Sequence, residues 1–290
     1  MSRLCMSGRR LSRLLPIATL AWAACAVPAL AQPDLNEIVR QAFERDRANE
    51  HRARQYTFHR RTRQSTLDGK GEVKGTESKT HDVTLLDGEE YERLIAVNGK
   101  PVDAKRELEE QRKLERSIEK RRNESPAQRQ KRIAKVEKDR EEERRWVREI
   151  LNVFRFSLAG EESIGGVPTW VIAAEPKPGY EPEYRKARFL TKLHGKFWIA
   201  KSDYGWVKVE AETIDTVSFG LFLVRLARGS TFQLHQKRME DDLWMMDEFR
   251  VRFEARAGLI KTFHKEVIGT FSNYRKFSAE SELIVGGEGK

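Results

Sequence analysis

One short stretch restricts the fold of this chain more than any other, the residues KFWIAKSDYGWVKVEAETID at positions 196–215. Two runs with the composition of β-strands flank a turn at 202–205. The first run carries Phe197, Trp198 and Ile199 in succession, so its side chains are apolar on both faces. A strand with one face in water has no need of this, so we expect a strand that is covered on both sides.

The N-terminus has the pattern of a secretory signal peptide. Arginines precede an apolar run over 14–27, and Ala29-Leu30-Ala31 is a small-x-small cleavage pattern. We therefore predict a signal peptide over 1–31, cleavage after Ala31 and a periplasmic location. A lipoprotein signal cleaved before Cys25 is the alternative, and it is disfavoured because Trp22 stands where a Leu-like residue is expected.

Cleavage changes the charge and removes both cysteines. It takes away 31 of 290 residues and four of 55 basic residues, which leaves 259 residues with 51 basic and 45 acidic side chains. The mature chain would have no disulfide and a formal charge of +6, so its core must supply its stability. Nucleic acid is not an expected partner of an exported protein with so small an excess of charge. We predict one domain over 32–290.

The chain after the signal begins with a helix and continues as an antiparallel meander. Asp34 is a helix cap with Glu37 as its capping-box partner. From Gln55, strands are separated by Asp-Gly at 68–69 and 87–88 and by Asn-Gly at 98–99, the dipeptides that favour two-residue hairpin turns.

The segment 103–149 is different, because it holds 17 Lys or Arg and 13 Asp or Glu in 47 residues, with no glycine. It predicts two charged helices, over 103–122 and 126–151, with Ser125 and Pro126 as cap and first residue of the second. We expect a protruding or loosely docked hairpin inserted between adjacent strand ends. A short bridge would then replace it without unfolding the sheet.

Strands return after this segment. They are expected over 153–163, 167–174 and 187–193, then as the pair in 196–215, and then as three long strands up to residue 277. The predicted fold is mainly β with helices (α+β): a half-open antiparallel barrel of about eight to eleven strands, covered by the N-terminal helix.

No residue pattern argues for an enzyme. The six histidines have no metal-type spacing with one another or with cysteine, and no nucleophile elbow is present. Glu210, Glu212 and Asp215 are the only acids in strongly apolar surroundings, and a paired-carboxylate hydrolase built on them is the alternative. We predict no catalytic residue, no metal and no cofactor.

The aromatic and aliphatic residues of the later strands have two interpretations. They could simply fill a core beneath a docked helix. They could also line a cavity, because a curled antiparallel sheet leaves an apolar face that one or two helices cover only in part.

An export signal, a short amphipathic helix, a meander with Asp-Gly turns, GKFWIAKSDYGWVKVEAE and FGLFLVRLARGSTF together resemble the outer-membrane lipoprotein-sorting (LolA/LolB-like) periplasmic superfamily. The resemblance covers roughly 53–277, with 103–149 as an insertion. It implies a half-open barrel with a helical lid that binds acyl chains of lipoproteins or related lipids. The expected partner is therefore a lipid or an acylated protein, and the candidate lining residues are Trp198, Ile199, Val207, Val209, Leu221, Leu223 and Phe253.

A second hypothesis assigns the function to the charged hairpin. The same fold would serve as a cell-envelope interaction or stress-sensing scaffold, with the hairpin as the contact surface for an anionic membrane or an envelope protein. Its basic residues beside the helix–helix turn are Lys120, Arg121, Arg122, Arg129, Lys131 and Arg132.

Overall fold

A computed structural model describes residues 34–86, 89–219, 224–257 and 261–276. The predicted signal peptide, the Asp-Gly turn at 87–88 and the candidate residues Leu221 and Leu223 lie outside this part of the chain. Among the described helices, none is both long and apolar enough to cross a membrane.

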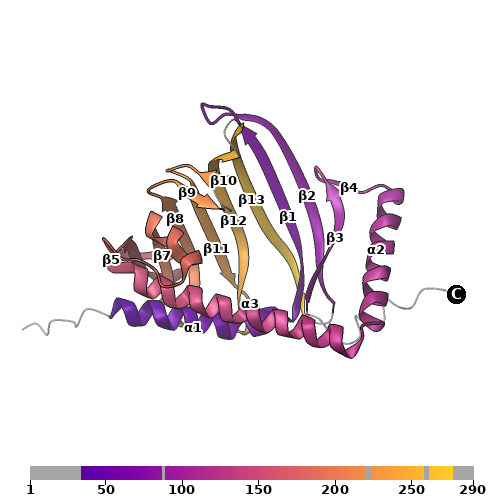
Figure 1. Cartoon of the computed structure of the whole chain (residues 1–290), viewed down its shortest axis with the longest axis horizontal. Coiled ribbons are helices and arrows are strands. Elements are labelled where there is room, and N and C mark those ends of the chain that lie inside the picture. Colours follow the sequence, from indigo (N-terminus) through magenta and orange to yellow (C-terminus); the bar gives the residue numbers. More distant parts are fainter. Residues whose placement is uncertain (1–33, 87–88, 220–223, 258–260, 277–290) are drawn as a thin grey trace, which may run out of the picture. The chain divides into compact units, whose positions relative to one another are not determined.

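The described strands form one antiparallel sheet (Figure 1), in the order β4-β3-β2-β1-β13-β12-β11-β8-β7-β6-β5. The sheet does not close on itself, since β4 and β5 are its two edges, and this confirms the predicted half-open architecture. The first and last strands pair with each other in its middle, with β1 beside β13. The strands of this order are β1 (Tyr56–Leu67), β2 (Val73–Leu86), β3 (Glu89–Val97), β4 (Lys100–Pro101), β5 (Phe154–Ile164), β6 (Val167–Pro176), β7 (Leu193–Ala200), β8 (Trp206–Thr213), β11 (Thr231–Arg238), β12 (Trp244–Ala257) and β13 (Lys261–Lys276). Off this order, β10 (Val224–Leu226) pairs with β12, and β9 (Val217–Phe219) pairs with β10.

The first helix, α1 (Leu35–Ala53), begins where the sequence predicts. The Asp34 carboxylate accepts hydrogen bonds from the backbone N–H of Asn36 (3.0 Å) and Glu37 (3.3 Å). Glu37 does not complete a capping box, because its carboxylate pairs with the Arg40 guanidinium at 2.5 Å. Helix α1 packs its buried side chains Ile38, Val39 and Ala42 against β6, β7 and β8.

Helices α2 (Ala104–Arg122) and α3 (Pro126–Val153) match the predicted ranges closely. Ser125 caps α3 in a capping box with Gln128, with bonds of 3.3 Å and 2.9 Å, which locates the start of the helix.

The two helices do not form a protruding hairpin, which corrects the prediction. Helix α2 packs on β3, whereas α3 packs on α1, on β5 and on the 3₁₀ helix η1 (Arg185–Lys192). Because β4 and β5 are opposite edges of the sheet, the segment between them connects one edge to the other. The ends of 103–149 therefore do not lie on adjacent strands, on which the prediction of a short replacement bridge depended.

The length of α3 suits this connection. Its 28 residues span about 42 Å at 1.5 Å per residue. Eleven strands about 4.8 Å apart would span about 48 Å if the sheet were flat, and curling brings the edges closer. One long helix is thus enough to reach from the β3 side to β5.

Two of the predicted turns can be compared with the structure. Asn98 and Gly99 have φ of 50° and 76°, as a two-residue turn with positive φ at both positions requires. The turn at Asp68 is wider than predicted, because the carboxylate of Asp68 accepts from the N–H of Lys70 (2.8 Å) and Glu72 (2.9 Å). Its positive φ belongs to Gly71.

The strand predicted over 187–193 is instead η1. Its buried residues Ala187 and Leu190 are three positions apart, the period of a 3₁₀ helix, and they pack on Val153 at the end of α3. The prediction failed because a short run of mixed apolar residues does not distinguish this period from the alternation of a strand.

The strand with two apolar faces is confirmed. Ile199 is fully buried against α1, on the face of the sheet that we call the inner face. Trp198 is 5% exposed and packs on the opposite, outer face with Val171, Val207 and Trp244. Since side chains alternate along a strand, the two clusters lie on the two sides of β7.

Candidate functional site

The inner face of the central strands carries a continuous set of half-buried apolar side chains, which we call the apolar strip. Cross-strand partners share a face of a sheet, so the register identifies its members. One row runs through Val209, Leu234, Phe249 and Gly269, and the next through Phe232, Val251 and Val267. The strip consists of Val209, Phe232, Leu234, Phe249, Val251, Phe253, Val267 and Phe271, each of intermediate exposure.

Helix α1 fixes one border of the strip. Val209 packs against the cluster that contains Ile38, Val39 and Ala42. Near its C-terminal end, the Asn49 side chain bonds both backbone groups of Trp244, donating to the carbonyl (2.5 Å) and accepting from the N–H (2.8 Å). The helix is therefore anchored at both ends while the strip beyond it keeps part of its area exposed.

A glycine shapes the floor of the strip. A Cβ at Gly269 would lie 2.1 Å from the Phe249 ring, so the ring occupies the space above that glycine. The Phe249 ring also lies 6.1 Å from the ring of Phe271, centre to centre. The missing side chain thus allows two aromatic rings to lie close together on β12 and β13.

The predicted lining residues do not share one surface. Val209 and Phe253 belong to the strip. Ile199 is on the same face but fully buried beneath α1, and Trp198 and Val207 are buried on the outer face. Trp198 is held there by its indole N–H, which donates to the Glu162 carboxylate at 2.7 Å.

A β-bulge explains part of this division. Ile199 is opposite Trp206 and Trp198 is opposite Lys208, so Val207 is the extra residue of β8. Lys208 consequently shares the outer face with Val207, and its Nζ lies 4.3 Å from the centre of the Trp198 ring. The other strip residues were missed as a site, although the alternation along β12 already placed Phe249, Val251 and Phe253 on one face.

The acids proposed for a hydrolase do not form a carboxylate pair in an apolar pocket. Glu210 is bound by Lys208 (2.6 Å), and Asp215 is bound by Lys192 (2.9 Å). Glu212 is an exposed residue opposite His194. The expectation that these three acids sit in apolar surroundings is therefore wrong.

The basic residues beside the α2–α3 turn fall into two groups, one paired with acids and one exposed to solvent. Arg121 and Arg132 both pair with Glu89 at the start of β3, and Arg132 also binds Glu124 (3.0 Å). These contacts dock the turn onto the sheet. Lys120, Arg122, Arg129 and Lys131 are exposed.

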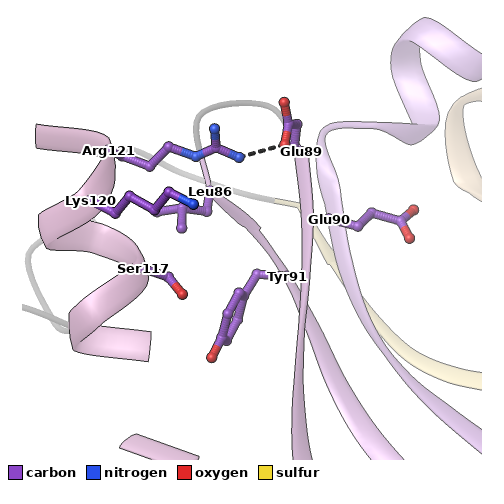
Figure 2. A pocket seen from close by; sticks show the side chains of 7 residues that line it. All are labelled: Leu86, Glu89, Glu90, Tyr91, Ser117, Lys120 and Arg121. Carbon is purple, nitrogen blue, oxygen red and sulfur yellow. Dashed lines mark hydrogen bonds and ion pairs between the residues drawn. The ribbon is translucent and has the colours of Figure 1, made fainter. Parts of the chain in front are cut away.

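Two polar cavities lie between α2 and strands β2 and β3. The first has a volume of about 190 Å³. Figure 2 shows Arg121 reaching Glu89 at the top of this cavity, with Ser117 and Tyr91 below them. The second, of about 310 Å³, is lined by Lys79, His81, Glu92, Leu94, Arg106, Glu110 and Lys113.

The second cavity holds two titratable residues whose pKa values are lowered, Glu110 and His81. Burial would raise the pKa of Glu110, but the Lys113 ammonium, a backbone hydrogen bond from Leu94 and the Arg106 guanidinium outweigh it and lower that pKa. Burial lowers the pKa of His81, which keeps this imidazole neutral at pH 7. Glu110 is therefore an ionised, buried acid that ties α2 to β3.

Comparison with known proteins gives only distant structural similarity. No family model matches the chain, and no curated protein matches it. Three solved structures show the range: a DUF1329 family protein from Desulfovibrio piger (13% identity, 86% of this chain and 95% of that chain, TM-score 0.31), a putative outer membrane lipoprotein-sorting protein domain from Vibrio parahaemolyticus (10%, 86% and 97%, 0.33), and the Pseudomonas aeruginosa MucA/MucB complex (11%, 85% and 100%, 0.22). A LolA superfamily protein from Nitrosomonas europaea also matches, at 9% identity and a TM-score of 0.26.

These matches include the superfamily that the sequence pattern resembles. At such identities and TM-scores they carry no conclusion about what this chain binds. The description of the fold therefore rests on the strand order and register given above.

Proposed function

We propose that this protein is a periplasmic, non-enzymatic binding protein that holds the acyl chain of a lipid or an acylated protein on the apolar strip. The observation that carries this proposal is the strip itself, with its half-buried side chains on the inner face beyond the border set by α1. Contiguous apolar surface that stays partly in water marks a binding surface for an apolar partner.

Burial of an acyl chain would supply the affinity. Apolar surface removed from water contributes about 25 cal/mol per Å², or about 0.8 kcal/mol for each buried methylene. Each added methylene should therefore strengthen binding by up to about fourfold, until the chain is longer than the strip. Such binding needs few fixed polar groups, so it does not depend on a catalytic constellation.

A matched pair of substitutions tests the proposal. Val251→Asp places a carboxylate in the strip, whereas Val73→Asp makes the same change at a valine that is 59% exposed. We expect a fluorescent fatty acid to bind the wild-type protein and the Val73 variant, and to bind the Val251 variant at least tenfold more weakly. Lipid co-purifying with the protein, identified by mass spectrometry, should follow the same order.

Wild-type protein that is reproducibly lipid-free and takes up no fatty acid would overturn the proposal. Thermal unfolding of each variant separates loss of the strip from loss of the fold. A folded Val251 variant that binds as well as wild type would place the ligand elsewhere.

A second candidate function uses the exposed basic residues of the α2–α3 turn. Lys120, Arg122, Arg129 and Lys131 are available to an anionic membrane or an acidic envelope protein, whereas Arg121 and Arg132 serve the docking of the turn. Changing the four exposed residues to Glu should abolish binding to anionic vesicles, because it reverses their charge. The assay is run at low salt, since charges on the surface are screened over about 8 Å at physiological ionic strength. If vesicle binding is unchanged, these residues are only exposed to solvent and this second function is rejected.

A further inference from the structure

The inner face changes from apolar to polar at the boundary between β13 and β1. One cross-strand row runs from Phe271 on β13 to Arg60, then to His81 on β2 and Leu94 on β3. The neighbouring row runs from Gly269 to Thr62 and Lys79. Strands are about 4.8 Å apart, so the polar residues begin within about 10 Å of the strip.

Helix α2 encloses the far end of this row. The 310 Å³ cavity lies at His81, Leu94 and Lys79, and α2 supplies Arg106, Glu110 and Lys113 as its other wall. Six of its seven lining residues are charged or polar, so the cavity suits a polar head group rather than an acyl chain.

Two buried nitrogen atoms at this boundary lack partners. Arg60 Nε and His81 Nδ1 are inaccessible to solvent, and neither has a hydrogen-bond partner within the described part of the chain. The arginine Nε–H is always a donor, and a buried donor left without an acceptor is costly. An acceptor group bound beside Arg60 would satisfy its Nε–H, and it would also satisfy His81 in the tautomer that carries its proton on Nδ1.

The charges around these atoms favour an anion. Three cations line the cavity with the acids Glu92 and Glu110, namely Lys79, Arg106 and Lys113. A fourth, Arg60, lies beside it, across from His81. Glu92 is paired with Arg60, and Glu110 is bound by Lys113 (2.6 Å) and Arg106 (3.4 Å). Lys79 is paired with Glu77 outside the cavity (3.1 Å), so the four cations exceed the three acids around them by one positive charge.

We propose that this cavity binds the anionic head group, a phosphate or a carboxylate, of an amphiphile whose acyl chain lies on the apolar strip. This inference rests on the proposed function, because it places head and chain on one continuous face. Hydrogen bonds from Arg60 and from the neutral imidazole of His81 to the charged oxygens would hold the head group. Lys113 would contribute from the helix side of the cavity.

The test compares ligands with the same twelve-carbon chain, below their micellar concentrations. Calorimetry measures binding of dodecyl phosphate, neutral dodecyl maltoside and inorganic phosphate to the wild-type protein and to variants. Arg60→Gln removes a charge beside the cavity, and Lys113→Gln removes one from its helix wall. Arg61→Gln is the matched control, because Arg61 is the next residue on β1, is exposed and points to the outer face.

We expect wild type to bind dodecyl phosphate about tenfold more tightly than dodecyl maltoside. Each cavity variant should reduce this preference to about threefold or less while leaving the affinity for the maltoside unchanged. The Arg61 variant should keep the full preference. Higher salt should weaken the binding of dodecyl phosphate and leave that of dodecyl maltoside unchanged.

Other results overturn the inference in distinguishable ways. Equal affinity for both amphiphiles would reject head-group recognition and leave acyl binding intact. Inorganic phosphate binding as tightly as dodecyl phosphate would identify a site for free anions. A preference unaffected by Arg60→Gln and Lys113→Gln would place the head group elsewhere, and failure of both amphiphiles to bind would reject the proposed function itself.

Discussion

The ring of Phe249 lies where a side chain at position 269 would have to be, with 2.1 Å between the ring and a Cβ added to Gly269. We predict that Gly269→Ala displaces this ring and lowers the free energy of unfolding by about 1–3 kcal/mol, the usual cost of overfilling a packed site. Chemical denaturation measures the change.

Gly75 provides the control for that substitution. It also lies on a strand, β2, and a Cβ there would have nothing within 4 Å. Gly75→Ala should leave stability unchanged or raise it slightly. Equal losses at both positions would mean that the Phe249 contact is not the cause.

The connection between the two sheet edges makes a prediction about shortening the chain. From Arg132, docked at β3, to Val153, which adjoins β5, α3 spans about 32 Å. A bridge of six residues reaches about 21 Å when fully extended. Replacing 103–149 with six Gly and Ser residues should therefore prevent folding, and a flexible bridge of about forty residues should restore the β-rich far-UV spectrum. A folded protein with the short bridge would contradict the edge-to-edge topology.

Asp203 joins α1 to the turns of the sheet and should make stability depend on pH. Its carboxylate accepts from Trp244 Nε1 (3.0 Å) and Gly205 N (3.2 Å) and lies 3.4 Å from Arg45. Burial would raise the pKa of Asp203, but Trp244, Gly205, Arg238 and Arg45 outweigh it and lower the pKa below 3.8.

Because the pKa of Asp203 is lower in the folded protein, its ionised carboxylate stabilises the fold fully above pH 3.8. This stabilisation is lost as the pH falls through the folded-state pKa. Asp203→Asn should therefore cost about 1–3 kcal/mol at pH 7, and the difference from wild type should shrink at pH 3. Urea denaturation at both pH values measures it. Asp247→Asn, in an exposed pair with Lys237, is the control expected to show little effect.

His81 should make the stability of the fold depend on pH at higher values than Asp203 does. Burial lowers its pKa from 6.5, Arg60 and Lys79 lower it further, and Glu92 and Glu110 oppose them. The unfolded chain therefore binds a proton more readily than the folded one, so stability falls as the pH drops through 6.5. We predict that His81→Gln flattens the loss of unfolding free energy between pH 7.5 and 5.5. His235→Gln, on the outer face, should not; identical slopes for wild type and the His81 variant would reject this role.

Local signals in the sequence predicted much of the fold. Asp34, Ser125 and Asn98 each act through neighbours a few residues away, so their effects are visible in a short window. The two apolar faces of β7 follow from three consecutive residues. In contrast, nothing local indicates that β4 and β5 are opposite edges, because strand order depends on pairings between distant parts of the chain.

The candidate site shows the same limit. Val209 and Phe253 were found because each stands in a strand of alternating or apolar character. Trp198 and Ile199 are consecutive and so lie on opposite faces, but only distant packing decides that both are buried core residues: α1 covers Ile199, and Val207 and Trp244 pack with Trp198. The polar end of the inner face was not predicted, since Arg60, His81 and Lys113 come together only through the register and the docking of α2.

The pairing of β1 with β13 has a consequence for the order in which the chain can fold. Strand β1 pairs with β2 immediately, but its other edge waits for residues about two hundred positions later. Contacts between such distant segments form slowly, because a long loop must close before they are made. The N-terminal meander thus has one edge unpaired until β13 is available, and the sheet becomes continuous only when β13 has joined β1.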